Sequence, residues 1–131
     1  MVQKIFKSRF LFKGMEVPLP EIIDRLSILK LKIENRKNPQ FEEEFKACEE
    51  AIKEFERKGY EIKREWLKEL YEINKHQWGL ESFLRKAKEK NNLSEAGKIY
   101  IRLQLSNKKR VAIKNKIFEE TGSGSHDIKV N

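Results

Sequence analysis

The sequence predicts an all-α fold: a bundle of about four helices built on a long antiparallel helical hairpin, preceded by a short extended N-terminal arm. Apolar residues recur at steps of three and four in four successive segments, which is the spacing of one helix face. Only three prolines and six glycines occur in 131 residues, so the stretches between them are free to form long helices. We expect an arm at 1–19, one helical domain at 20–122 and a flexible tail at 123–131.

The first two predicted helices are short. The first spans 20–36, because Pro20 suits an opening turn and an apolar stripe follows it. It should stop at Asn38, since Pro39 disfavours helical geometry in the residue before it. The second spans 40–58 and is acidic, with seven Glu against four Lys and Arg and hence a net charge of −3. The stripes are Ile22, Leu26, Leu29 and Ile33, and then Phe41, Cys48, Ile52 and Phe55.

The last two predicted helices are long. The third covers 61–90 and should end at Asn91 and Asn92. Ser94 is the predicted N-cap of the fourth, which runs to about Thr121. The short connection between them predicts antiparallel pairing as a hairpin. The inward stripes are Trp66, Leu70, Ile73, Leu80 and Leu84, and then Ile99, Leu103, Ile113 and Ile117.

Both ends of the chain differ from the middle. Residues 10–17 predict an extended arm or a short hairpin, and 128–130 a possible short strand within a loose tail. A small core and uncovered apolar edges predict a homo-oligomer, a dimer or larger assembly. The residues at those edges are Phe10, Phe12, Tyr60 and Ile101.

Composition and missing motifs exclude several classes. The chain carries a net charge of +8 and no apolar stretch long enough for a membrane span or a secretory signal, so we expect a cytoplasmic protein. A single cysteine, Cys48, and two histidines exclude an internal disulfide and a structural zinc site. No GxxxxGK[ST], GxGxxG or HExxH motif occurs in a suitable context. We predict no metal and no cofactor.

Two polar stripes are the most informative pattern. On the third helix, residues at steps of four and three share one face beside the apolar seam: Leu67, Tyr71, Asn74, Trp78, Glu81 and Arg85. A second stripe lies on the fourth helix: Asn107, Arg110 and Lys114. Antiparallel pairing should bring the two stripes face to face.

The facing stripes have two interpretations. In the first they form a ligand pocket, where an aromatic side chain stacks on a planar ring, cations hold anionic groups and amides fix orientation. Trp78 or Tyr71 would stack on the ring, and Asn74 and Asn107 would fix its orientation. The cations that would hold the anionic groups are Arg85, Arg110 and Lys114. In the second, Glu81 pairs with Arg110 or Arg85 to set helix register. Asp24 is either an ordinary helix-start acid or a partner of Arg110 from a third helix.

Three segments resemble a family of small bacterial and phage helical proteins of unknown function, some near or fused to glycosyltransferases. They are PLPEIIDRLSILKLKIEN, ELYEINKHQWGLESFLRKAKEK and KIYIRLQLSNKKRVAIKNKIFEETGS, within 18–123. The family pattern falls on Asp24, Arg25, Asn74, Trp78, Glu81, Arg85, Asn107, Arg110, Gly122 and Ser123. The resemblance implies a helical fold and a shared polar set, and favours the pocket interpretation.

The function predicted first is non-catalytic binding of a small phosphorylated ligand, most plausibly a nucleotide or nucleotide-derived signal, which a phage protein would sequester from host defence. One alternative is a nucleic-acid-binding accessory protein, because residues 85–116 hold eleven bases and two acids, a net of +9. The other is an enzyme acting on nucleotides or nucleotide sugars, with Glu81 or Asp24 as general base or metal ligand. It ranks last, because a helical nucleotide hydrolase is expected to present several carboxylates at Glu-x-x-Glu spacing for Mg²⁺, and the Glu42 to Glu56 set lies on the second helix, away from the stripes.

Overall fold

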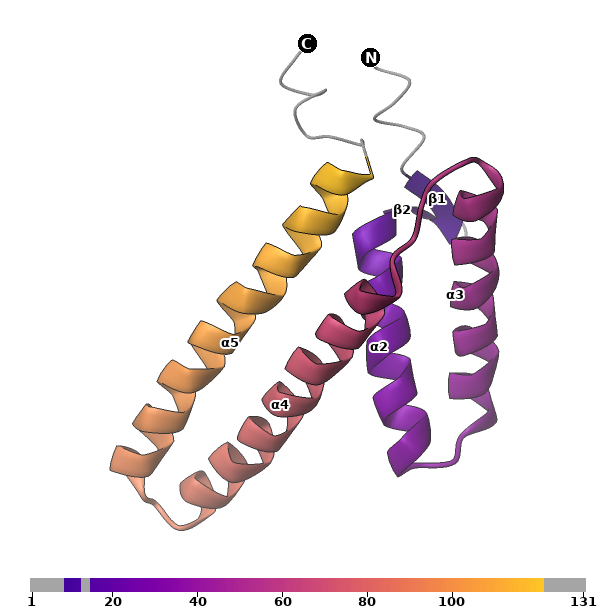
Figure 1. The fold of residues 1–131 in the computed structure, drawn as a ribbon. Helices are drawn as coiled ribbons and strands as arrows, with labels where there is room; N and C mark the ends of the chain where they lie inside the picture. The colour runs from indigo at the N-terminus through magenta and orange to yellow at the C-terminus, as the bar shows by residue number, and fades with distance from the viewer. Residues whose placement is uncertain (1–8, 13–14, 122–131) are drawn as a thin grey trace.

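Four helices and a two-stranded hairpin make up the described part of the protein (Figure 1). The computed structural model describes residues 9–12 and 15–121. The strands are β1 (Arg9–Phe12) and β2 (Met15–Pro18), and the helices are α2 (Leu19–Asn35), α3 (Pro39–Arg57), α4 (Arg64–Glu89) and α5 (Leu93–Glu120). The predicted all-α class is therefore confirmed. Within the described residues, none of the helices has the length and apolarity that a bilayer crossing requires.

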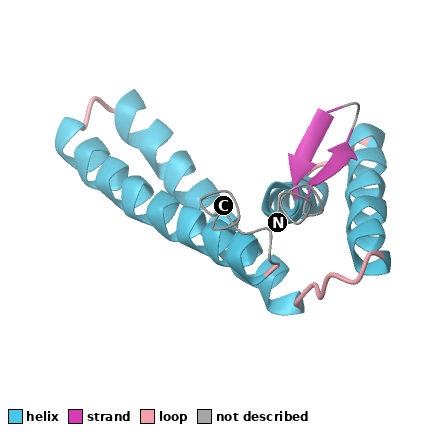
Figure 2. Ribbon diagram, turned by 90° about the horizontal axis from the view of Figure 1, so that it is seen from above, coloured by secondary structure: helices cyan, strands magenta, loops and turns pink. Residues whose placement is uncertain are grey.

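The helices α4 and α5 form the predicted antiparallel hairpin (Figure 1). Helix α2 packs against this hairpin, and α3 packs against α2 on the side away from α5 (Figure 2). The axis of α2 diverges from the hairpin towards the closed end of α4 and α5. That end of the hairpin therefore extends beyond the reach of the other helices.

The boundary between α2 and α3 lies three residues before the predicted stop. Helix α2 ends at Asn35, and its C-cap Arg36 is already extended, with φ −157°. Asn38 is instead the N-cap of α3, where its side-chain oxygen accepts a hydrogen bond from the Gln40 amide at 3.0 Å. The Pro39 that follows occupies the first turn, where its missing N–H costs nothing.

The predicted cap of α5 is wrong. Asn92 is the N-cap, because its side-chain oxygen accepts a hydrogen bond from the Glu95 amide at 3.1 Å. Ser94 lies inside the first turn of the helix. Asn91 has a φ of 56°, a left-handed conformation that asparagine tolerates better than most residues. The two asparagines thus close α4 and open α5 in a single tight turn.

The N-terminal arm is a short antiparallel hairpin, one of the two predicted forms. Arg9 pairs with Pro18 and Phe12 with Met15. The strand β2 leads directly into α2, which begins at Leu19. The side chains of Phe10 and Phe12, the tail at 123–131 and its possible strand at 128–130 lie outside what the structure describes.

The buried apolar side chains form two separate clusters. The larger one, the α2 core, joins α2, α3 and the open end of the hairpin: Leu19, Ile22, Ile23, Leu26, Leu29, Cys48, Ala51, Phe55, Trp66, Leu70 and Ile117. The smaller one, the tip cluster, lies between α4 and α5 alone: Leu80, Ala87, Ala96 and Ile99. Tyr60 packs edge-on against the Phe55 ring at 5.5 Å, so it belongs to the border of the α2 core and is not the uncovered edge we predicted. Ile101 is exposed, as that prediction requires.

One ion pair joins the two open ends of the hairpin and predicts a pH dependence. Lys63 Nζ, at the N-cap of α4, lies 2.6 Å from Oε1 of Glu120, the last residue of α5. This hydrogen bond lowers the pKa of Glu120 from its usual 4.5. The stabilisation is therefore present above about pH 4.5 and is lost as the pH falls through the lowered pKa. In Glu120→Gln, thermal melts should show a smaller drop in Tm between neutral and acid pH than in the wild type.

The exposed neighbour Glu119 provides the control, because it forms no ion pair with any residue that the structure describes. The melting curve of Glu119→Gln should keep the wild-type dependence on pH. A drop in Tm with acid that is the same for Glu120→Gln and the wild type would contradict the role of this ion pair.

Candidate functional site

A carboxylate buried between three helices organises the site. Asp24 lies on α2 with only 4% of its side chain exposed. Both of its oxygens face Arg110 of α5, whose Nε donates to Oδ1 at 3.1 Å and whose Nη2 donates to Oδ2 at 2.5 Å. This is the paired fork geometry that binds a guanidinium most firmly to a carboxylate. Of the two roles predicted for Asp24, the structure shows the partnership with Arg110.

Helix α4 joins the same network through Asn74. Its Nδ2 donates to Oδ1 of Asp24 at 2.9 Å and to Oγ of Ser27 at 2.8 Å. The Ser27 hydroxyl in turn donates to the Asp24 main-chain carbonyl at 2.7 Å. Asn74 and Ser27 are both buried, so each hydrogen bond replaces one that water would otherwise make. The network therefore fixes the rotation of α2 and α4 relative to each other.

Lys114 extends the network at the rim. Its Nζ lies 2.8 Å from Oε2 of Glu21 and 3.8 Å from Oδ2 of Asp24. The hydrogen bond to Asp24 raises the pKa of Arg110, with smaller contributions from the charges of Asp24, Glu21 and Glu81. The predicted pairing of Glu81 with Arg110 or Arg85 is wrong: among the described residues Glu81 forms no ion pair with either, and Arg110 binds Asp24 instead. The buried network is thus largely satisfied within the bundle.

A groove opens beside this network, where α2 diverges from α4. It consists of two adjoining hollows of about 610 Å³ and about 190 Å³ that share Leu31, Lys32 and Trp78. We call them together the α2–α4 groove. The smaller hollow reaches inward to the network: Ile28, Asn74, Gln77, Glu81 and Arg110. The larger one opens towards the end of α2: Glu34, Asn35, Arg36, Lys75, Gly79, Ser82 and Arg85.

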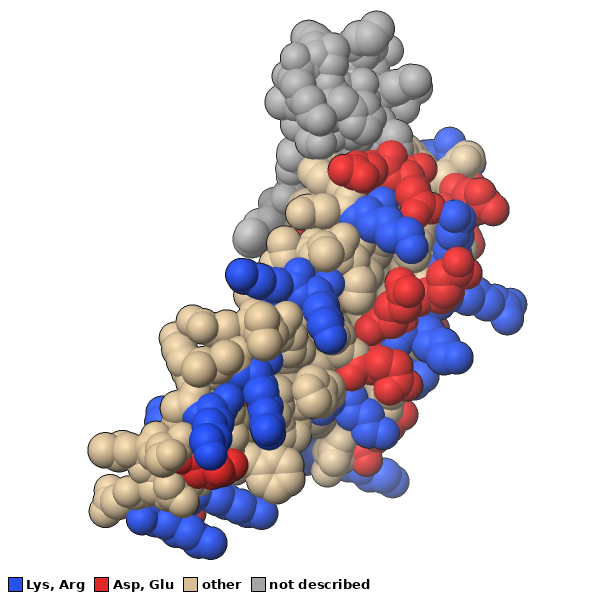
Figure 3. Space-filling model, turned by 60° about the vertical axis from the view of Figure 1, so that its left-hand side comes forward, with Lys and Arg blue, Asp and Glu red and all other residues tan. Residues whose placement is uncertain are grey.

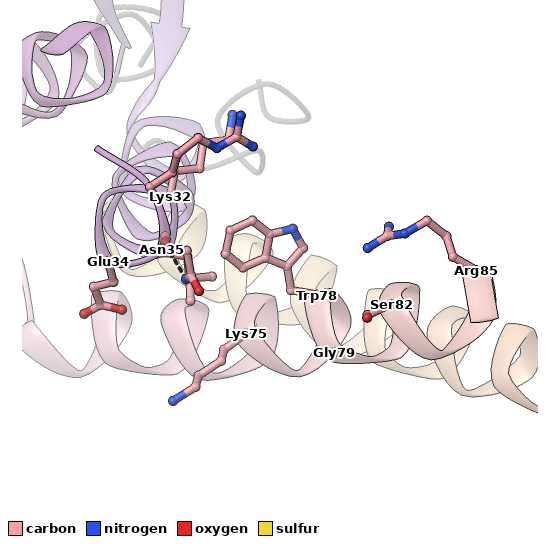
Figure 4. Close-up of a pocket in the computed structure, with 10 residues that line it drawn as sticks. Lys32, Glu34, Asn35, Lys75, Trp78, Gly79, Ser82 and Arg85 are labelled. Carbon is pink, nitrogen blue, oxygen red and sulfur yellow. Dashed lines mark hydrogen bonds between the residues drawn. The ribbon is translucent and has the colours of Figure 1, made fainter. Parts of the chain in front are cut away.

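Trp78 is the central side chain of the groove. Its indole rises from α4 between the two hollows, and 37% of its surface remains exposed (Figure 4). The Arg85 guanidinium extends along α4 on the same side, whereas Lys75 points away (Figure 4). Gly79 and Ser82 lie between Trp78 and Arg85 on α4 (Figure 4), and their small side chains leave space above the helix in the larger hollow. An aromatic face and a cation are therefore presented side by side to the solvent.

Basic groups outnumber acidic ones around the α2–α4 groove. Its lining holds five basic and two acidic side chains: Lys32, Arg36, Lys75, Arg85 and Arg110, with Glu34 and Glu81. In the described part of the chain, neither Arg36 nor Arg85 forms an ion pair. Two guanidinium groups thus remain available at the mouth, and guanidinium matches the geometry of phosphate and carboxylate.

The structure divides the residues that the sequence predicted for the site. Trp78, Glu81 and Arg85 line the groove, and Asn74 and Arg110 connect it to the buried network. Asp24 and Lys114 belong to the network but do not line the groove. The structure therefore contains a buried network with Asp24 in the place predicted for Glu81, and the ligand pocket stays a prediction for the groove beside it.

Two of the predicted residues lie elsewhere. Tyr71 does not line the groove: its hydroxyl donates to Oε1 of Glu34 at 2.5 Å, which raises the pKa of Tyr71. Asn107 is exposed on α5 and also lies outside the lining. Asn107 lies about 60° around α5 from Arg110 and almost one turn nearer the closed end of the hairpin, where α2 diverges from it (Figure 1).

The sequence reasoning missed two basic residues of the groove. Lys32 and Arg36 come from the end of α2, where a cation is also the ordinary complement of the helix dipole. The available signal was their spacing of four, which places both on one face one turn apart. Ser27 was missed as well, and it follows Asp24 by three residues.

The carboxylates do not gather at the groove. Asp24 is held by Arg110 and Asn74, and within the described residues no three side chains of His, Cys, Asp or Glu are grouped to hold a metal ion. The site instead offers one aromatic face, several cations and amides, a set suited to binding. No protein-family profile, no curated protein and no solved structure is significantly similar to this chain.

Proposed function

We propose that the protein is a non-catalytic binder of a small phosphorylated ligand with a planar ring, a nucleotide or a nucleotide-derived signal, held in the α2–α4 groove. The observation that carries this proposal is the exposed indole of Trp78 between two hollows whose rim bears Arg36 and Arg85. A buried tryptophan would need no ligand to explain it, but an exposed one in a basic groove is a ready stacking surface.

The dimensions of the groove suit such a ligand. The two hollows together amount to about 800 Å³, the sum of 610 Å³ and 190 Å³, within the usual range for small-molecule sites. A ring stacked on Trp78 would place its phosphates at Arg85 on one side or at Lys32 and Arg36 on the other. Asn74 and Gln77 offer amide groups at the inner end for a base edge or a sugar hydroxyl.

The buried network supports the proposal by holding the inner wall rigid. Arg110 is fixed by Asp24, so its remaining N–H groups meet a ligand in the smaller hollow at little cost in side-chain entropy. In a phage protein, such a site would serve to sequester a host defence nucleotide. That role requires tight binding and no turnover.

The test is a titration with a matched series: ATP, AMP, adenosine and inorganic phosphate, with the other three nucleoside triphosphates added to compare bases. Trp66 is buried, so changes in intrinsic fluorescence on ligand addition report mainly on Trp78. We expect nucleotides to bind at least about tenfold more tightly than adenosine, because each charge-assisted contact contributes roughly 1.5–3 kcal/mol. Native mass spectrometry of freshly purified protein would show a retained ligand directly.

Two outcomes would contradict the proposal. Equal affinity for adenosine and its phosphates would show that the basic rim takes no part in binding. Duplex or single-stranded nucleic acid that binds more tightly than any mononucleotide, and resists high salt, would favour the nucleic-acid alternative.

A further inference from the structure

The side of the hairpin turned away from α2 has no partner among residues 9–12 and 15–121, which the structure describes. We call it the outer face. Two hollows follow one another along it, and both are lined by α4 and α5 alone. The tip hollow has a volume of about 560 Å³ and the open-end hollow about 650 Å³. The outer face therefore forms a continuous surface along most of α4, about 39 Å at 1.5 Å per residue.

Apolar side chains lie on the outer face between the centre of the hairpin and its tip. Leu80, Phe83 and Ile99 line the tip hollow, and Phe83 is among the most exposed aromatic side chains described. Arg102 lines the tip hollow and Lys109 lines the open-end hollow. Leu105, which is 55% exposed, lies three residues after Arg102 and four residues before Lys109. This spacing places Leu105 on the same stripe of α5. The tip cluster beneath is built from two helices only, so it gains most from a third layer.

The two ends of the outer face have opposite charge. The tip hollow holds three bases and one acid: Lys86, Lys90, Arg102 and Glu95. The open-end hollow holds three acids and two bases: Glu65, Glu69, Glu72, Lys68 and Lys109. Figure 3 shows the same tendency on the α5 side of the molecule, with acidic side chains gathered towards the upper right and mostly Lys and Arg at the lower end.

We propose that the outer face binds a second copy of this chain, with the two hairpins antiparallel and related by a twofold axis. In that arrangement the basic tip of each hairpin meets the acidic open end of the other, and the apolar residues of both faces are covered. The product is a four-helix bundle with an isologous interface. The α2–α4 groove lies on another side of α4 and stays open, so this assembly does not depend on the proposed ligand.

The charge pattern decides between this occupant and others. A parallel pair would bring like ends together, which costs energy at both ends. A nucleic acid lying along the outer face would meet the row formed by Glu65, Glu69 and Glu72, spaced four and three apart. A second copy in the antiparallel orientation supplies both signs of charge in the reversed order.

The first test measures mass in solution by light scattering coupled to size-exclusion chromatography. The wild type should have twice the 15.7 kDa chain mass, with a dissociation constant that rises with salt. Leu105→Glu should weaken the dimer by roughly tenfold or more, because a charge would be buried without a partner. Val111→Glu is the matched control: Val111 is 45% exposed on α5 but lines neither hollow, so this variant should remain dimeric.

The second test reports orientation by disulfide trapping. Glu65 and Lys90 are exposed at opposite ends of the outer face, and the native Cys48 is buried. A mixture of Glu65→Cys and Lys90→Cys should form the mixed disulfide, and neither variant alone should crosslink efficiently. Efficient crosslinking of each variant with itself would overturn the antiparallel arrangement. A monomeric wild type, or equal weakening by Leu105→Glu and Val111→Glu, would overturn the proposed surface.

Discussion

Arg110→Ala should lower the free energy of unfolding by about 3–5 kcal/mol, measured by urea denaturation. The reason is the burial of its partner: with 4% of its side chain exposed, Asp24 would keep a charge that water cannot reach. Asn74 would still donate to Oδ1, and Lys114 Nζ would still lie 3.8 Å from Oδ2, but neither replaces the two charged hydrogen bonds of the guanidinium. Arg110→Lys should lower the free energy of unfolding by less than Arg110→Ala, because the lysine keeps the positive charge although it cannot reproduce both hydrogen bonds of the guanidinium.

The reverse truncation should cost less. Asp24→Asn leaves the guanidinium of Arg110 unpaired, but 26% of that side chain is exposed and it reaches the groove. Asp24→Asn should therefore lower the free energy of unfolding by about 1–3 kcal/mol. The double variant Asp24→Leu/Arg110→Met should recover much of the stability, since replacing both ions of a buried pair is often neutral. A wild-type unfolding curve for Arg110→Ala would contradict the structural role of this pair.

Trp78→Ala should weaken nucleotide binding by about 5- to 150-fold. Stacking of a base on an aromatic side chain contributes roughly 1–3 kcal/mol, which converts to that range of affinity. Isothermal titration calorimetry is the suitable measurement, because the variant lacks the fluorescent reporter. Trp78→Phe should retain part of the affinity through its smaller ring.

The controls separate a binding effect from a folding effect. Trp78 is partly exposed, so Trp78→Ala should keep a Tm close to that of the wild type. Tyr100→Ala removes another exposed aromatic side chain, on α5 and outside the groove, and should bind ATP as the wild type does. ATP affinity that is unchanged in Trp78→Ala would exclude the indole as the stacking surface.

Helical periodicity predicted most of the fold and part of the site. The steps of three and four in the α4 stripe placed Asn74, Trp78 and Arg85 on one side of the helix, and antiparallel pairing brought Arg110 close to Asn74. These inferences needed only the geometry of a single helix and of its neighbour in sequence. The end of α2 was predicted less well, because Asn38 satisfies the start of α3 better than the end of α2.

The partner of Arg110 could not be derived in the same way. Periodicity gives the faces of a helix but not the rotation of one helix against a third, so both Glu81 and Asp24 remained possible partners of Arg110. Burial decides between them in the structure: Asp24 is enclosed, whereas Glu81 is exposed at the groove. Lys32 and Arg36 were hidden for a related reason, because a base at a helix end already has a local explanation.

The separation of the α2 core from the tip cluster has a consequence for the motions of the chain. Local opening costs least where few buried side chains must be exposed, and the tip is held by contacts between two helices only. We therefore expect the end of the hairpin to open more readily than α2, α3 and the open end. The α2–α4 groove spans this border, with Arg110 anchored in the stable part and Arg85 carried by the labile part. A ligand that contacts both Arg110 and Arg85 would couple these two parts of the fold. Its binding would lower the population of states in which the tip is open.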